Sequence, residues 1–121
     1  MRATGRWDVG DPEVDVFVDA SIVSFAAWDL VIFLNRNPET REPLAGMATV
    51  LARQESDLIP AVRRLVETGV LVESTEAGEV GYRLTDDAGV RDIVARFLAM
   101  AARREHRLEF VRRVLAHLTG A

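Results

Sequence analysis

The 121-residue chain contains no cysteine. This absence excludes disulfides and thiolate-bound metal sites. The chain has only two histidines, His106 and His117, which cannot form a zinc site on their own and lie about three turns apart on the helix predicted below. We therefore expect neither a metal nor a cofactor.

No apolar run is long enough to span a membrane. The most hydrophobic segment, residues 22–34, is interrupted by Asp29 and falls short of the roughly 20 residues that a spanning helix needs. Residues 1–20 contain acidic side chains in place of the apolar core of a signal peptide. We expect no membrane association and no secretion, and hence a cytoplasmic protein.

The motifs of common enzyme chemistries are also missing. The sequence has no glycine-rich phosphate loop, no cysteine and histidine arrangement, and no serine in a nucleophile motif. The adjacent carboxylates of Asp86 and Asp87 lie where a helix is expected to begin, and there they favour its amino-terminal dipole. We expect no enzymatic activity.

Length and composition indicate one domain, because 121 residues with 49% hydrophobic side chains can bury an ordinary core. The net charge of −4 disfavours a general polyanion binder. The charge is unevenly spread: residues 70–87 hold one arginine and five carboxylates, whereas residues 88–121 hold seven arginines and three carboxylates. Binding to nucleic acid therefore depends on local charge.

The first part of the chain is predicted to lead into a central helix. Val14, Val16 and Val18 alternate with acidic neighbours, which predicts a strand-like, extended arm over residues 1–20. Ser21 is expected to cap a helix that ends near residue 35, and its dense apolar positions place that helix in the core. A short strand is expected at residues 39–43.

Residues 44–69 predict two helices joined by a turn. Apolar spacing indicates a support helix over residues 44–53, and the turn falls near residues 54–56. Ser56 or Asp57 is expected to cap the second helix, with Pro60 near its first turn. Gly69 is expected to end this helix. Its buried face is predicted to consist of Leu58, Val62, Leu65 and Val66.

A two-stranded hairpin and a long helix are predicted to follow. Strand-like runs at residues 70–74 and 80–84 flank a loop that contains one glycine. A single helix is then expected over residues 88–117. It carries a heptad seam of Val90, Val94, Phe97, Ala101, Arg104, Leu108, Val111, Leu115 and Leu118, which packs either on the domain or on a second copy.

The second helix and the end of the hairpin carry a family resemblance. The relevant residues are Ser56, Leu58, Val62, Arg64, Leu65, Val66, Glu67 and Gly69, followed by Leu84, Thr85 and Gly89. This pattern resembles the winged helix-turn-helix transcription regulators of the MarR, PadR and ArsR type, over about half of the chain. The resemblance implies a mainly α fold with a small β-hairpin wing. Its parts are an amino-terminal arm (1–20), a winged helix-turn-helix (21–87) and a dimerising helix (88–121).

The same resemblance implies a DNA-binding transcription regulator that acts as a homodimer. The second helix would enter the major groove of double-stranded DNA. The candidate DNA contacts are Arg53, Gln54, Ser56, Arg63, Arg64 and Arg83, and the candidate dimer contacts are Val94, Phe97, Leu108, Val111 and Leu115.

Several positions depart from the pattern of those regulators. Asp57, Ile59 and Pro60 cannot make a bidentate contact with guanine. Glu76 and Glu79 stand at the wing tip, where those regulators place an arginine. The alternative is a winged-helix protein-interaction module that binds no DNA.

Two further groups of residues admit two interpretations each. The aromatic residues Phe25, Trp28, Phe33 and Phe97 either line a pocket for a small-molecule effector or pack in the core, and their helical spacing favours the core. The arginines between residues 103 and 113 form either an anion-binding surface or a solvated helix face. The interleaved glutamates favour the solvated face.

Overall fold

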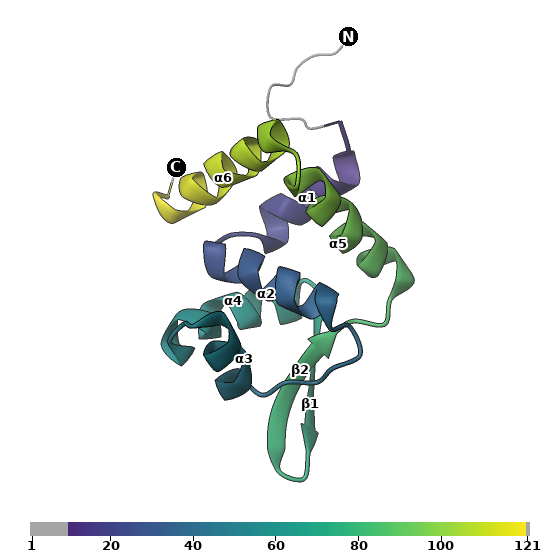
Figure 1. Cartoon of the computed structure of the whole chain (residues 1–121), viewed down its shortest axis with the longest axis vertical. Coiled ribbons are helices and arrows are strands. Elements are labelled where there is room, and N and C mark those ends of the chain that lie inside the picture. Colours follow the sequence, from purple (N-terminus) through teal and green to yellow (C-terminus); the bar gives the residue numbers. More distant parts are fainter. Residues whose placement is uncertain (1–9, 121) are drawn as a thin grey trace.

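The computed structural model describes residues 10–120 of the chain. Figure 1 shows the β-hairpin projecting from one end of the molecule, with α1, α5 and α6 at the other end and α2 between them. The elements are, in chain order, α1 (Pro12–Ser21), α2 (Phe25–Arg36), α3 (Leu44–Leu51), α4 (Glu55–Glu67), β1 (Leu71–Glu76), β2 (Glu79–Leu84), α5 (Ala88–Ala101) and α6 (Arg104–Leu118). This mainly α fold with a hairpin after α4 confirms the predicted fold class and its winged-helix-like order.

Helix α1 takes the place of the predicted extended arm. The Asp11 side chain caps the helix by accepting a hydrogen bond from the Val14 amide at 3.2 Å, and Pro12 occupies the first turn, where no donor is needed. Val16 is 69% exposed, whereas the buried positions follow helical spacing. The prediction of an extended arm is therefore wrong over Pro12–Ser21. Residues 1–9 lie outside the described part of the chain. The buried side chains of α1 are Val14, Phe17, Val18 and Ser21.

Helix α2 occupies the central position that the sequence predicts, but it starts later. Its cap is Ser24, whose hydroxyl accepts a hydrogen bond from the Ala27 amide at 3.1 Å, so the cap predicted at Ser21 is wrong. Ser21 is buried at the end of α1 and donates to the Thr68 hydroxyl at 2.9 Å. This bond ties the end of α1 to the end of α4.

Helices α3 and α4 form the helix-turn-helix unit. The turn passes through Ala52 in the left-handed region, with φ of 54°. Helix α4 begins at Glu55 and has no side-chain cap, so the predicted caps at Ser56 and Asp57 are wrong. Pro60 lies inside the helix, beyond the first turn. Gly69, with φ of 81°, follows the end of α4 as predicted.

The wing is a tight antiparallel hairpin in which Leu71 faces Leu84 and Glu76 faces Glu79. Ala77 and Gly78 form the connection, and both have positive φ, which is typical of the turns that match strand twist. The loop is therefore shorter than predicted. The strand expected at residues 39–43 is reduced to one bridge, in which the backbones of Glu42 and Tyr82 exchange two hydrogen bonds.

The carboxy-terminal segment forms two helices where the sequence predicts one. Helix α5 ends at Ala101, and Arg103 has extended backbone angles before α6 begins. The guanidinium of Arg107 donates to the carbonyl oxygens of Ala101 and Ala102, both at 3.2 Å, which satisfies the end of α5. Because of this break, the residues of α6 that face the core do not continue the inward-facing stripe of α5. The predicted heptad seam is therefore not continuous.

An aromatic cluster holds α1, α2, α5 and α6 together. The Phe97 ring lies 5.5 Å from those of Phe17 and Trp28 and 5.0 Å from that of Phe110, measured between centroids. Phe97 and Phe110 are completely buried. Phe110 is absent from the predicted seam, and its packing on Phe97 turns the seam residues of α6 toward solvent.

Candidate nucleic-acid interface

Helix α4 presents one buried and one exposed face. Leu58, Ala61, Val62 and Leu65 are buried, and Val66 is half-buried, which agrees with the predicted inner face. The exposed face points away from α2 and α3 because the helix packs on them with its apolar stripe. It consists of Ser56, Asp57, Ile59, Pro60, Arg63, Arg64 and Glu67.

Arg63 and Arg64 are exposed on this face, and neither forms an ion pair with any residue that the structure describes. Arg63 lies toward the wing: burial and the charge of Glu73 raise the pKa of Tyr82 on β2, and the charge of Arg63 opposes them. Their guanidinium groups are thus free to bind an anion.

Three further residues that were predicted to contact DNA lie at or next to the turn before α4. One of them is paired with a carboxylate, and the other two are exposed. The guanidinium of Arg53 binds the carboxylate of Asp29 on α2, at 3.0 Å from Nε and 2.7 Å from Nη2. This ion pair neutralises the charge of Arg53. Gln54 and Ser56 are exposed, at the cap and in the first turn of α4, with their side chains open to solvent.

Arg83 lies at the base of the wing. It donates to the carboxylate of Asp86 at 2.8 Å and to the carbonyl of Leu84 at 3.2 Å. The hydrogen bond from Arg83 and then its charge hold the pKa of Asp86 below its ordinary value, so the two groups are paired over the neutral range. The structure does not bring Arg83 to the wing tip.

Arg41 is a functional candidate that sequence reasoning missed. It lies across the wing and donates to the hydroxyl of Ser74 at 2.9 Å, to its carbonyl at 3.0 Å, and to the carbonyl of Glu79. Gly81 allows this approach, because a Cβ there would lie 2.7 Å from Cζ of Arg41. A glycine inside a strand pattern signals such a close contact, and it could have indicated a partner for the wing.

The charge of this face is mixed and mostly acidic. The free cations, Arg63 and Arg64, stand on α4, while Arg41 neutralises part of the wing through an ion pair of 3.7 Å with Glu76. A cleft of about 470 Å³ separates α4 from the wing, and apolar side chains and Tyr82 form most of its lining. The exposed carboxylates of the face belong to Glu55, Asp57, Glu67, Glu73, Glu76 and Glu79.

Of the five predicted dimer contacts, some are buried within the single chain and others are exposed on α6. Val94 and Phe97 are completely buried within the single chain, so they cannot contact a second copy, and their assignment to a dimer seam is wrong. Leu108 and Leu115 are 41% and 47% exposed on α6, and Val111 is half-buried. Among the predicted dimer contacts, only those on α6 therefore form an exposed apolar stripe.

Other kinds of site find no support in the described part of the chain. Within residues 10–120, no group of three or more histidine, aspartate or glutamate side chains is arranged to hold a metal ion. No single helix there is long and apolar enough to cross a membrane. Helices α1 and α2 pass that test of length and composition only when taken as a pair, and the pair is bent by 118°.

The comparisons with known proteins leave the family open. No protein-family model and no curated protein matches this sequence. The structure supports the coarser part of the resemblance, a mainly helical domain with an antiparallel hairpin after the helix-turn-helix unit.

Proposed function

We propose that the chain is a winged-helix transcription regulator that binds double-stranded DNA as a homodimer. The observation that carries the proposal is the pair of exposed, unneutralised guanidinium groups of Arg63 and Arg64 on the outer face of α4. This helix follows a helix-turn-helix turn and precedes a wing, the arrangement in which winged-helix regulators place a helix in the major groove.

The proposed mechanism assigns separate roles to the ends of α4. Arg63 and Arg64 contact phosphates beside the groove, because a guanidinium group binds phosphate with two parallel hydrogen bonds. Gln54 and Ser56 supply hydrogen bonds at the amino-terminal end of the helix. A second copy doubles these contacts, which compensates for the small number of free cations in one chain.

The test of this proposal is the double variant Arg63→Ala and Arg64→Ala, measured by fluorescence anisotropy with a DNA fragment that the wild type binds. Loss of four phosphate contacts in a dimer is expected to reduce the slope of log K against log salt by about 3 to 4. The matched control is Arg103→Ala with Arg104→Ala, which removes the same charge from exposed positions at the junction of α5 and α6. Equal slopes for the two double variants would refute the role of α4.

A second candidate function is a protein-interaction module that binds no DNA. The specific observation in its favour is the acidic wing beside the partly apolar cleft that Ile59, Val62 and Tyr82 line. This face would repel phosphate but accept a basic, partly apolar segment of a partner. Failure of the wild type to bind DNA at low salt would favour this second function.

A further inference from the structure

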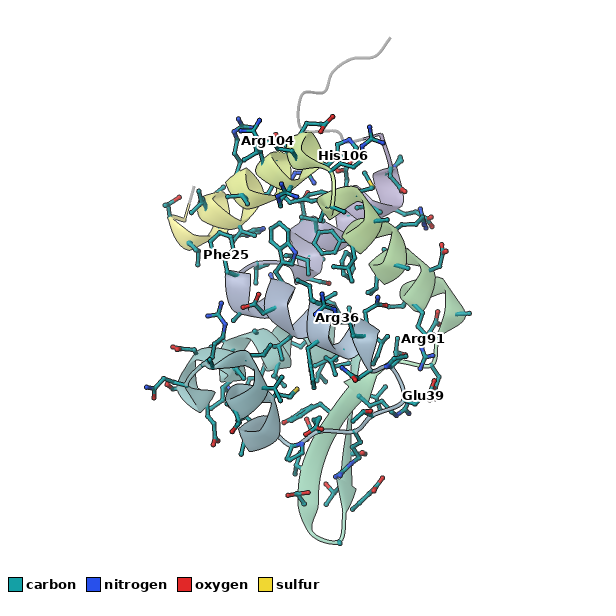
Figure 2. All side chains as sticks on the ribbon, in the orientation of Figure 1. Phe25, Arg36, Glu39, Arg91, Arg104 and His106 are labelled. Atoms are coloured by element: carbon teal, nitrogen blue, oxygen red, sulfur yellow. The ribbon has the colours of Figure 1, made fainter. Side chains whose placement is uncertain are left out.

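A groove of about 580 Å³ lies between α2 and the junction of α5 and α6, away from the α4 face. Figure 2 shows Phe25 and Arg36 near opposite ends of α2, with α6 above this helix and α5 beside it. These residues are the first and last of the helix, so the groove floor extends over about 16 Å at 1.5 Å per residue. Its volume falls in the range of small-molecule sites. Its apolar lining includes Phe25, Trp28, Ile32, Leu98 and Val111.

The aromatic wall of the groove is held in place by the core. The rings of Phe25 and Trp28 are stacked, with centroids 6.4 Å apart and planes 22° apart, and both side chains are half-buried. The other side of Trp28 packs on Phe97 and Phe110, at 5.5 and 6.3 Å between centroids. Because buried rings fix Trp28, the wall is preformed and does not have to be ordered by a ligand.

The charged groups of the groove leave an excess of positive charge. Arg36 forms no ion pair with any residue among 10–120. Arg107 donates to the carbonyl groups of Ala101 and Ala102, so no carboxylate neutralises it. Asp29 is the one acidic residue in the lining, and its carboxylate is already bound to Arg53. Two of the arginines that line this largely apolar groove therefore have no carboxylate partner among the described residues.

We propose that this groove binds a small amphipathic organic anion. The carboxylate or similar group of the ligand pairs with Arg36, Arg107 adds positive charge to the lining, and the apolar body of the ligand lies against Phe25, Trp28 and Ile32. A guanidinium group recognises a carboxylate through paired hydrogen bonds. Burial of the apolar body supplies most of the binding free energy.

The charge of the groove also disfavours a second copy of this chain as its occupant. The exposed stripe that a second copy would offer lies on α6 beside Arg104 and Arg107, which have no carboxylate partner among the described residues, whereas Arg112 is paired with Glu109. Unpaired arginines of a second copy would repel Arg36 and Arg107 of the first copy, which disfavours this occupant.

The test uses decanoate and the cation decyltrimethylammonium, which share the same apolar tail, below their micelle concentrations. A Trp7→Phe variant of the full chain leaves Trp28 as its single tryptophan, and therefore as the fluorescent reporter of the groove. Decanoate is expected to change the Trp28 emission saturably with one site per chain, confirmed by calorimetry, whereas the cation is expected to bind at least tenfold more weakly. Equal binding of the two probes would refute the proposal.

Two variants in this background locate the site. Arg36→Ala is expected to weaken decanoate binding about tenfold, whereas Arg104→Ala, which removes an exposed arginine outside the groove lining, is expected to leave it unchanged. Ala102→Phe fills the groove from an exposed position without adding a second tryptophan, and it is expected to abolish binding while the circular dichroism spectrum stays native. Decanoate binding that survives both Arg36→Ala and Ala102→Phe would overturn the assignment. A groove closed to decanoate because two copies of the chain associate over it would overturn it as well. No DNA is present, so failure here is distinct from failure of the proposed function.

Discussion

At the scale of single residues, arginines fix the first helix to the last two. Arg96 on α5 binds the carboxylates of Asp11 and Glu13, at 2.7 and 2.6 Å, and Arg113 on α6 binds Asp15 at 2.9 Å. The side chain of Arg113 is only 9% exposed, so removing its charge partners would leave a buried cation. The acidic residues of the segment that was predicted to be an extended arm therefore anchor a helix.

Asp11 makes this anchor dependent on pH. Burial tends to raise its pKa, but the hydrogen bond from the Val14 amide and the interactions with Arg96 outweigh burial and hold the pKa below the ordinary value of 3.8. A carboxyl whose pKa is lowered by folding stabilises the fold above its unfolded pKa, and this contribution is lost as the pH falls through the folded pKa.

The variant Asp11→Asn tests this contribution, since asparagine keeps the helix cap and loses the charge. At pH 7 we expect a loss of about 0.5 to 1 kcal/mol in the free energy of unfolding, the size of a well-formed surface ion pair. Urea unfolding from pH 7 to pH 2.5 should show the difference from wild type shrinking below pH 3.8. Glu67→Gln, which removes a carboxylate that pairs with no described arginine, is the control. A difference that stays constant with pH would contradict the charge-based explanation.

For the candidate binding residues, the sequence predicts which side chains of α4 face outward but not which arginines are already paired. The helical spacing of Leu58, Val62 and Leu65 placed Arg63 and Arg64 on the outer face of α4, where the structure has them. Spacing could not show that Arg53 is bound to Asp29, because this pair joins the turn before α4 to α2 and its two residues are 24 positions apart in the chain. Spacing also could not show that Arg41 crosses the wing, because that contact depends on how the segment before α3 folds back onto β2.

At the scale of elements, the sequence predicted local turns better than long-range packing. Gly69 and Gly78 mark the end of α4 and the hairpin turn, and both adopt the positive φ that glycine favours. The break between α5 and α6 has neither glycine nor proline, since Ala102 and Arg103 occupy it. It forms because Phe110 packs on Phe97, and sequence periodicity does not report that tertiary contact.

The wing is the element whose charge most opposes DNA. Glu79 is exposed next to the turn, and Arg41 contacts its backbone carbonyl, so its carboxylate can be replaced without loss of that bond. If the wing lies near phosphate, Glu79→Arg is expected to tighten DNA binding several-fold at low salt. Glu105→Arg makes the same change of charge on α6 and should have a smaller effect in the same anisotropy measurement. Equal effects would place the wing away from DNA.

Helix α6 carries the remaining candidates for a dimer contact. The double variant Leu108→Glu and Leu115→Glu introduces charge into its exposed apolar stripe without altering the core. We expect the mass measured by light scattering to fall from that of a dimer to that of a monomer, because burying an unpaired carboxylate in an interface is costly. Val16→Glu, at a 69% exposed position on α1, should leave the dimer intact. A dimer that survives the double variant would exclude this stripe as the interface.

At the scale of the whole molecule, α2 connects the two ends shown in Figure 1. Its buried face packs on α4, and its other side supports α5 and lines the groove. Asp29 belongs to the groove lining and also binds Arg53 at the helix-turn-helix turn. The candidate ligand site and the candidate DNA site are therefore connected through one helix and one ion pair.

The central claim is that α4 recognises particular DNA sequences. The most direct measurement is capture and sequencing of genomic fragments by the purified protein at low and near-physiological salt, in parallel with the Arg63→Ala and Arg64→Ala double variant. We expect the wild type to enrich a recurrent palindromic site at both salts, with half-sites about one helical turn apart, and the variant to lose this enrichment. Absence of any enriched site for the wild type at either salt would contradict the claim.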